Sequence, residues 1–270
     1  MGNHYCETWI NIIERQVFNN DKWENNMKIN GFFKKYWERF KKAIHSPVLL
    51  FLLSSIALHM ITYFGTRLFT KKMEHFDMTT MLDDKIPFAS WTIIIYFGCY
   101  LFWGINYAFG CLQDEEEAEK FLSADFIAKF VCLICFVVIP TTKSRPVPSD
   151  DGVFNLAMVF LYRIDAADNL FPSIHCLTSW FSVIAIRRQN DIPKAYKYFS
   201  VLFTLAICIS TLTTKQHAIV DTISGVMLAE ASYQFVCRYD FVSGYKKVLV
   251  SIKDKVVRKK RKGYKYRDAA

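Results

Sequence analysis

Long apolar blocks constrain the fold of this chain more than any other feature of its sequence. Apolar residues make up 52% of its 270 residues, and they are gathered in runs instead of being spaced as in amphipathic helices. A helix that crosses a bilayer needs roughly 20 mostly apolar residues, and several of these runs reach that length. Because a helix satisfies its own backbone hydrogen bonds in lipid, the sequence predicts a helical membrane protein.

Six membrane-spanning helices are predicted, with approximate limits at residues 47–69, 87–112, 124–139, 170–186, 198–212 and 218–236. Before the first span, Phe33, Trp37 and Phe40 share one face of a helix whose other side is basic. This pattern is typical of a helix that lies on a membrane surface, and a solvated helix packed on a partner is the alternative. The expected fold is an all-α membrane protein: a six-transmembrane-helix bundle with an N-terminal amphipathic interfacial helix.

The distribution of lysine and arginine predicts the orientation of the chain. The net charge is +9, and basic residues collect before the first span, between the fourth and fifth spans, and in the tail. We therefore expect a cytoplasmic N-terminal segment (1–45) with the amphipathic helix, a six-span membrane domain (46–237) and a basic cytoplasmic tail (238–270). Other basic residues, among them Arg67, Lys71, Lys72 and Lys85, fall on the outer side and count against this orientation.

The tail and the cysteines limit the expected partners. The basic run at 253–262 adjoins membrane spans, so we expect it to contact anionic lipid headgroups. No nucleic-acid partner is expected, because the run lacks aromatic interleaving and any binding motif. The eight cysteines are scattered and mostly lie in apolar blocks, so we expect neither disulfides nor a zinc site. The oligomeric state is not predicted.

Three polar segments, residues 141–146, 171–175 and 210–221, reach the outer face together on this topology. The last of them holds His217 and Asp221, which are four residues apart, so one helical face would carry both. The Asp221 carboxylate can accept one imidazole N–H, fix the tautomer and leave the other nitrogen as a nucleophile.

The other two segments add an acid and cations. His175 supplies a second imidazole, suited to protonate a leaving alkoxide. Lys143, Arg145 and Lys215 can neutralise a phosphate and the charge that spreads over its equatorial oxygens. Together these residues indicate phosphoryl transfer. A metal site built on the two histidines and the aspartate is the alternative, but the spacing is not that of a zinc site, so we expect no metal and no cofactor.

The three segments resemble the signature of the type 2 phosphatidic acid phosphatase superfamily. That signature is a Lys and an Arg-Pro, then Pro-Ser-Gly-His, then Ser-Arg, five residues, His, three residues and Asp. The resemblance covers roughly residues 138–225, with Val138, Ile174 and Thr211 standing where the family has Lys, Gly and Arg. Lys143 and Lys215 are the candidate replacements for the missing cations. Phe-Pro-Ser-Ile-His and Lys-Gln-His are closer to the branch that contains inositol-phosphorylceramide and sphingomyelin synthases.

This resemblance implies a role for each site residue. His217 would attack phosphorus and form a phosphohistidine, Asp221 would orient it, and His175 would be the general acid. The residues that would bind the substrate phosphate are Lys143, Arg145, Ser173 and Lys215. Neither a metal nor a cofactor is implied.

The resemblance also implies the function and its location. We expect an integral-membrane lipid-phosphate phosphatase whose substrate is a membrane lipid phosphate. The alternative is a lipid phosphotransferase that moves a headgroup to an alcohol acceptor, and a non-catalytic membrane protein or transporter is the third hypothesis. We expect a multi-pass protein of the cell membrane, with the active site on the extracytoplasmic face and both termini in the cytoplasm.

Overall fold

The computed structural model describes residues 27–149 and 151–267, and about three quarters of the protein is helical. The chain forms two compact units, residues 1–44 and 45–270. The first unit contributes helix α2 (Met27–His45), which includes the segment expected to be an amphipathic interfacial helix. Its location on a membrane surface stays a prediction.

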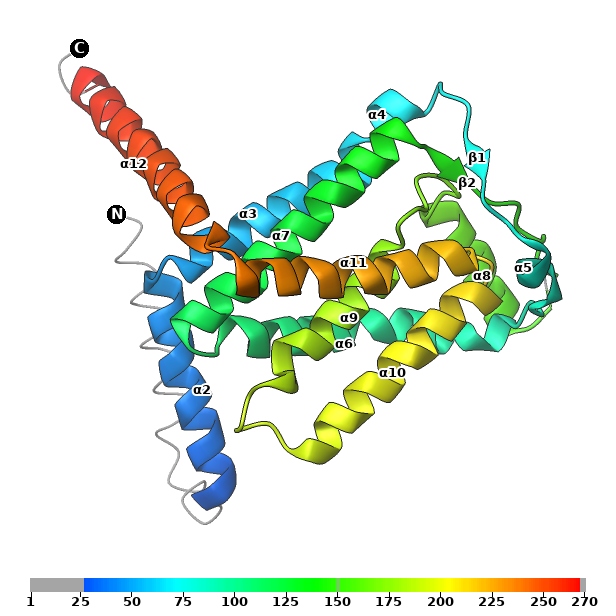
Figure 1. Ribbon diagram of the computed structural model, residues 1–270, viewed down its shortest axis with the longest axis horizontal. Helices are drawn as coiled ribbons and strands as arrows, with labels where there is room; N and C mark the ends of the chain where they lie inside the picture. The colour runs from blue at the N-terminus through cyan, green and yellow to red at the C-terminus, as the bar shows by residue number, and fades with distance from the viewer. Residues whose placement is uncertain (1–26, 150, 268–270) are drawn as a thin grey trace. The chain divides into compact units, whose positions relative to one another are not determined.

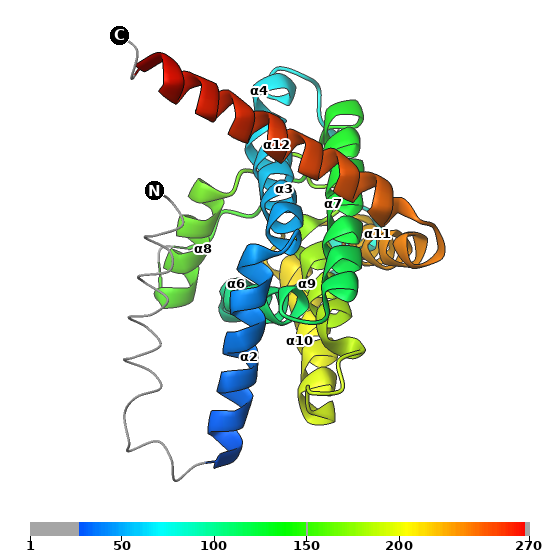
Figure 2. The same ribbon diagram turned by 90° about the vertical axis from the view of Figure 1, so that its left-hand side faces the viewer.

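The second unit is a set of helices with one short parallel pairing of strands (Figures 1 and 2). Its long helices are α3 (Val48–Met60), α6 (Ile93–Cys111), α7 (Glu115–Val138), α8 (Val153–Ile164), α9 (Ile174–Arg187), α10 (Lys194–Thr213), α11 (Ile219–Arg238) and α12 (Phe241–Arg267). Its short elements are η2 (Ile61–Gly65), α4 (Arg67–Thr70), β1 (Phe76–Asp77), α5 (Met81–Lys85), η3 (Ser90–Thr92) and β2 (Thr141–Thr142).

Within residues 27–149 and 151–267, four helical stretches are long and apolar enough to cross a membrane: Val48–Thr70, Ser90–Cys111, Glu115–Val138 and Lys194–Thr213. They match the first, second, third and fifth predicted spans. The other two predicted spans are also helical, but α9 has only 14 residues. The last, α11, has 20 residues, and its polar side chains, among them Asp221, Glu230 and Gln234, reduce its apolar character.

The start of α7 differs from the sequence-based expectation. The third span was expected to begin at residue 124, after an acidic run that followed the second span. Instead, Asp114 is the N-cap of α7, and Glu115, Glu116 and Glu117 form its first turn. Carboxylates in a first turn interact favourably with the positive end of the helix dipole, so the acidic run begins the third span instead of separating two spans.

The short helix α9 is the most buried helix of the second unit. Every residue from Ile174 to Ile186 except Trp180 is buried, and α9 packs against α6, α10 and α11. Since α9 faces other helices, it can carry hydroxyl side chains with partners inside the protein. Ser179 is an example: its Oγ donates to the carbonyl of His175 at 2.7 Å and accepts from Trp103 Nε1 at 2.9 Å.

Gly225 allows α11 to approach the first turn of α9. A Cβ at this position would lie only 2.4 Å from the carbonyl oxygen of Ser173 and 3.2 Å from the backbone nitrogen of Leu177. The N–H of Ser173 also donates to the carbonyl of Asp221 at 3.0 Å. The glycine therefore brings the beginnings of the two helices together.

Six helix ends meet at one end of this unit. The N–H of Ala89, before α6, donates to the carbonyl of Thr213, at the end of α10, at 3.0 Å. Thr141, just after α7, accepts from the N–H of Leu170, before α9, at 2.8 Å. Asn169 Nδ2 donates to Thr70 Oγ1, at the end of α4, at 3.1 Å. With the contact between α9 and α11, these bonds gather one end of each of the six predicted spans.

The opposite end is also tied together by polar contacts. Arg187 forms a bidentate ion pair with Glu230, with Nη1–Oε2 and Nη2–Oε1 distances of 2.7 and 3.0 Å, which joins α9 to α11. Gln189, after α9, donates to the carbonyl of Phe109 on α6 at 2.9 Å. The six helices that correspond to the predicted spans thus alternate in direction between the two ends.

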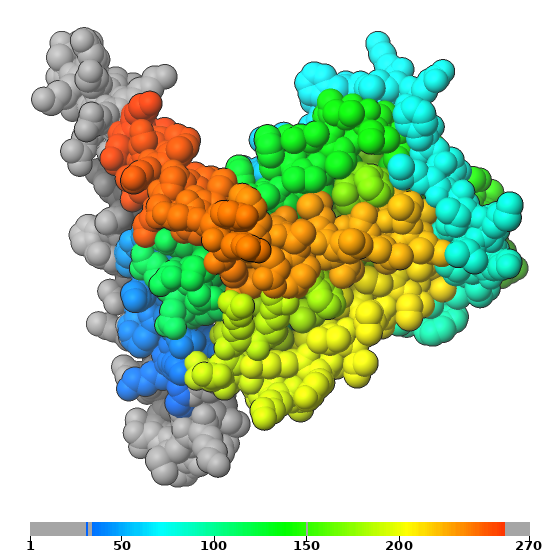
Figure 3. Space-filling view, viewed as in Figure 1, coloured from blue at the N-terminus to red at the C-terminus, as the bar shows by residue number. Residues whose placement is uncertain are grey.

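Large apolar side chains cover the outside of the long helices. On α10 they include Leu202, Leu205 and Ile209, and on α11 they include Ile223 and Met227, all of them exposed. The spacing of three or four residues puts each set on one helical face. Figure 3 shows α7, α10 and α11 side by side on one surface of this unit. Rows of large exposed apolar side chains of this kind indicate contact with lipid.

Candidate active site

Two histidines, one from a helix and one from a loop, face each other at the end where the six helix ends meet. The distance from His217 Nε2 to His175 Nδ1 is 3.5 Å, and both side chains are buried. His175 lies in the first turn of α9, and His217 lies in the loop before α11. The two imidazoles that the sequence placed on the same side of the membrane are therefore neighbours.

Asp221 lies on the other side of the His217 ring. The distance from His217 Nδ1 to Asp221 Oδ2 is 3.6 Å, and the same oxygen accepts the N–H of Ala218 at 2.8 Å. The expected common helical face of His217 and Asp221 is wrong, because α11 begins only at Ile219. The pair meets because the carboxylate turns back to cap the helix, which directs it toward the preceding loop.

His175 is surrounded by aromatic rings and bonded to one of them. Its Nε2 lies 2.8 Å from the hydroxyl of Tyr96, which is fully buried on α6. The ring centroids of Tyr96 and Trp103 lie 4.8 and 5.6 Å from that of His175. Tyr96 also donates to Asp165 Oδ2 at 3.1 Å. The nitrogen of His175 that points away from His217 is thus engaged.

Arg145 is held on the same side by three contacts. Its Nη1 donates to the carbonyl of Asp165 at 2.6 Å, and its Nη2 donates to Gln216 Oε1. The guanidinium carbon lies 4.9 Å from the ring centroid of Tyr162 on α8, a cation–π contact. Gln216 directly precedes His217, so these bonds connect the arginine to the histidine loop.

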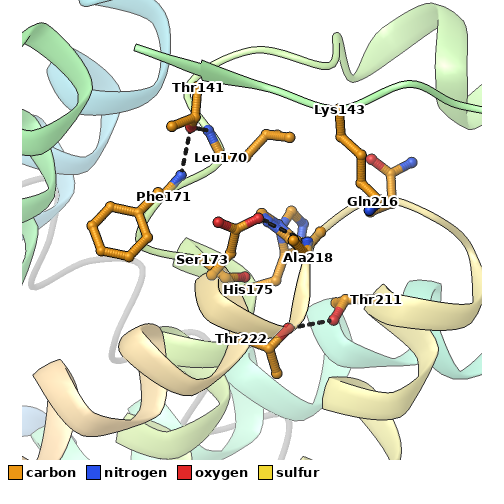
Figure 4. A network of polar contacts seen from close by, with 12 residues as sticks. Thr141, Lys143, Leu170, Phe171, Ser173, His175, Thr211, Gln216, Ala218 and Thr222 are labelled. Atoms are coloured by element: carbon orange, nitrogen blue, oxygen red, sulfur yellow. Dashed lines mark hydrogen bonds and ion pairs between the residues drawn. The ribbon is translucent and has the colours of Figure 1, made fainter. Parts of the chain in front are cut away.

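Both predicted lysines contact the segment between β1 and α6. Lys143 is buried and donates to Thr79 Oγ1 at 3.0 Å. Lys215 donates to the carbonyls of Asp83 and Ile86 at 3.0 and 2.5 Å. Burial lowers the pKa of Lys215, and the positive charge of Lys143 lowers it further. Figure 4 shows Lys143 and Gln216 in the same close view as Ser173 and His175.

Ser173 and Thr211 have structural contacts in this network. Ser173 is the N-cap of α9, and its Oγ accepts the N–H of Cys176 at 3.3 Å. Thr211 stands where the family motif has arginine. Its carbonyl accepts the N–H groups of Gln216 and His217 at 2.9 and 3.2 Å. Thr211 thus shapes the histidine loop.

Several buried polar atoms of the site have no hydrogen-bond partner among the described residues. They are Arg145 Nε, Gln216 Nε2, His217 Nδ1 and Asp221 Oδ1. Arg145 Nε and Gln216 Nε2 are donors, so they suit an anionic oxygen. In the described part of the chain, no three His, Cys, Asp or Glu side chains form a group that could hold a metal ion.

Sequence reasoning missed four residues of this site: Tyr96, Asp165, Gln216 and Asp83. Asp83 caps α11 through a bond from the N–H of Ile219 to its Oδ1, at 2.7 Å. Gln216 lies in the polar segment 210–221, directly before His217, so the sequence could have indicated it. Tyr96 lies in an apolar span, where a tyrosine is usually taken as an interfacial aromatic residue, and it carries no local signal.

Comparison with known proteins gives one match. The family model described as the PAP2 superfamily matches residues 72–235, which is more than half of the chain and includes both His175 and His217. Comparison with curated proteins and with solved structures found no match.

Proposed function

This chain belongs to the type 2 phosphatidic acid phosphatase (PAP2) superfamily, and we propose that it is an integral-membrane lipid-phosphate phosphatase that acts through a phosphohistidine on His217. Members of the superfamily are phosphoric-ester hydrolases or phosphotransferases. One observation carries the proposal: His217 has Asp221 at its Nδ1, 3.6 Å away, and His175 at its Nε2, 3.5 Å away.

In the first half-reaction, His217 Nε2 attacks phosphorus. Asp221 orients the ring and stabilises the positive charge that develops when Nδ1 keeps its proton. The bond from phosphorus to the lipid oxygen breaks, and the leaving oxygen takes a proton from His175. The cations Lys143, Arg145 and Lys215 stabilise the negative charge on the phosphoryl oxygens, together with the N–H donors at the start of α9 beside Ser173.

In the second half-reaction, water gives a proton to His175 and attacks phosphorus. The phosphorus–nitrogen bond breaks, and inorganic phosphate leaves. A phosphoryl group between the rings needs more space than the 3.5 Å that separates the two nitrogens, so at least one ring moves when substrate binds. No step requires a metal ion, because cations of the protein handle the charge.

The arrangement of the helices supports the predicted topology. The six predicted spans alternate in direction. Helix α9 can be a span although it has only 14 residues, because it packs against other helices and not against lipid. The end opposite to His217 carries Arg187, Arg188, Lys194 and Lys197, and the positive-inside rule assigns such an end to the cytoplasm. We therefore propose six spans in the cell membrane, with both termini in the cytoplasm and the site on the extracytoplasmic face.

The C-terminal helix fits the same orientation. Helix α12 begins beside the cytoplasmic end, where Lys246 pairs with Glu119 of α7 at 2.7 Å. We propose that the basic run at 253–262, which lies within α12, contacts anionic lipid headgroups, and that α2 lies on the cytoplasmic membrane surface.

A lipid phosphotransferase is the second candidate. The motif forms Phe-Pro-Ser-Ile-His and Lys-Gln-His favour it, because they resemble the synthase branch of the family. The first half-reaction is the same, and an alcohol replaces water in the second.

A panel of labelled lipids tests both candidates. Purified protein in detergent receives phosphatidic acid, phosphatidylglycerol phosphate, an isoprenyl diphosphate, phosphatidylinositol or phosphatidylcholine, each with and without ceramide or diacylglycerol. Release of inorganic phosphate without an acceptor supports the phosphatase, and a product that forms only with an acceptor supports the transferase. His217→Ala should abolish either activity, and His75→Ala, in the loop after α4, is the matched control. Activity that survives in His217→Ala would contradict the proposal.

A further inference from the structure

A chain of hydrogen bonds runs behind His175, on the side away from His217. His175 Nε2 lies 2.8 Å from the Tyr96 hydroxyl, which lies 3.1 Å from Asp165 Oδ2. The other carboxylate oxygen of Asp165 accepts a hydrogen bond from the hydroxyl of Tyr63 at 2.6 Å. Four different elements, η2, α6, the end of α8 and α9, supply these residues.

The direction of each bond follows from the number of protons available. The hydroxyl of Tyr96 has one proton, and an ionised carboxylate can only accept. Burial raises the pKa of Asp165, but the charge of His175, the hydrogen bond from Tyr63 and the charge of Arg145 outweigh burial and lower that pKa below its usual range. Asp165 is therefore ionised, Tyr96 donates a hydrogen bond to it, and the Tyr96 oxygen accepts a hydrogen bond from the Nε2–H of His175.

This direction selects the tautomer of His175. The Nε2–H of His175 donates to Tyr96 and stays on the ring. The nitrogen that exchanges a proton is therefore Nδ1, which is the atom that faces His217. In the other neutral tautomer the proton is on Nδ1, and Tyr96 would have to donate to Nε2 instead of to Asp165. Neutral His175 could then not accept a proton from water at Nδ1.

The carboxylate at the end of this chain is itself held in place. Arg67 Nη2 lies 3.6 Å from Asp165 Oδ1, and Arg67 Nε bonds to Asp168 Oδ1 at 2.7 Å. Arg145 donates to the backbone carbonyl of Asp165 at 2.6 Å. A fixed carboxylate, a buried tyrosine and an imidazole in series are an arrangement that orients a general acid.

We propose that Tyr96 and Asp165 are positioning residues, which hold the proton of His175 on Nε2 and so make Nδ1 the atom that protonates the leaving oxygen. The inference rests on the proposed function, since it concerns the same reaction. In the first half-reaction, doubly protonated His175 gives its Nδ1 proton to the lipid oxygen as the phosphorus–oxygen bond breaks. In the second, Nδ1 takes the proton of water or alcohol. Tyr96 keeps its proton and Asp165 stays ionised throughout.

The test compares substrates whose leaving groups differ in their need for an acid. An alkoxide leaves poorly without a proton, whereas 4-nitrophenolate leaves readily. With phosphatidic acid in detergent micelles, Tyr96→Phe should lose on the order of 10²-fold in kcat, the lower range for general acid catalysis, with little change in KM. With 4-nitrophenyl phosphate the loss should be less than about fivefold, because the acid contributes little to that step.

Matched variants separate positioning from folding. Tyr100→Phe removes a hydroxyl one turn further along α6 that lies outside this chain of bonds, and it should keep wild-type rates on both substrates. Asp165→Asn should repeat the selective loss, so the inference stays testable if Tyr96→Phe does not fold. Equal losses on both substrates, or no loss on either, would overturn the positioning role.

The phosphoenzyme distinguishes failure of this inference from failure of the proposed function. If wild type forms phosphohistidine on His217 but Tyr96→Phe and Asp165→Asn show no leaving-group dependence, only the positioning role is wrong. If wild type forms no phosphohistidine and turns over neither substrate, the proposed function fails, and the inference falls with it.

Discussion

The close approach of α11 to α9 at Gly225 leads to a quantitative prediction for Gly225→Ala. The added Cβ would lie 2.4 Å from the carbonyl oxygen of Ser173, whereas ordinary contacts begin at 3.4 Å. The beginnings of α9 and α11 must therefore separate by about 1 Å. Since the clashing atoms belong to the backbone, no side chain can turn away, and we expect a loss of stability of about 1–3 kcal/mol.

The same displacement should affect catalysis. His175 and Ser173 move with α9, while His217 and Asp221 move with the start of α11. Misplacement of reacting groups by about 1 Å can reduce a rate by on the order of 10². We therefore expect Gly225→Ala to lower kcat by about two orders of magnitude, and also to lower the midpoint of thermal unfolding in detergent.

Gly104→Ala is the matched control for this prediction. It also lies within a helix, α6, and a Cβ at this position would meet no atom within 4 Å. Alanine is favoured over glycine inside a helix by roughly 0.5–1 kcal/mol, so Gly104→Ala should keep full activity and equal or greater stability. Wild-type activity and stability in Gly225→Ala would refute the reasoning from helix contact.

Three further predictions concern the cations, the loop and the metal. Burial and Lys143 lower the pKa of Lys215, so the cation is lost at a pH below that of an ordinary lysine. The alkaline fall of kcat/KM should shift to higher pH in Lys215→Arg, and an unchanged pH profile would contradict the role of Lys215. Asp83→Ala removes the hydrogen bond to the N–H of Ile219. It should lower the free energy of unfolding by about 1 kcal/mol and raise KM. An unchanged unfolding midpoint and KM would count against the capping role of Asp83. Activity should survive EDTA and be inhibited by vanadate, a mimic of five-coordinate phosphorus; loss of activity with EDTA that added divalent metal restores would disprove metal independence.

Helices that depend on local sequence were predictable. The apolar blocks predict six spans, and among the described residues four of these are helices long and apolar enough to cross a membrane. The start of α7 was not predicted. A run of three glutamates is typical of a loop, but at the start of a helix these carboxylates interact favourably with the helix dipole. The shortness of α9 was also missed, since its apolar block extends back to residue 170, whereas the chain turns into a helix only after Ser173.

The candidate site was predictable only where its residues lie in one segment or resemble a motif. The spacing of His217 and Asp221 predicted that they lie close together. They do, but because Asp221 caps α11 and not because they share a helical face. Tyr96 and Asp165 were not predictable, because they are 69 residues apart and meet only through tertiary packing. Buried tyrosines in apolar spans have many structural roles, so only the distance to His175 singles out Tyr96.

Trapping of the phosphoenzyme tests the central claim most directly. Purified protein is mixed with a lipid labelled with ³²P in its phosphate, quenched within milliseconds, and digested to locate the label. The account predicts a labelled peptide that contains His217, with a bond that is stable to alkali and labile to acid, and no label in His217→Ala. Label on a serine, an aspartate or a cysteine, or labelling that persists in His217→Ala, would contradict it.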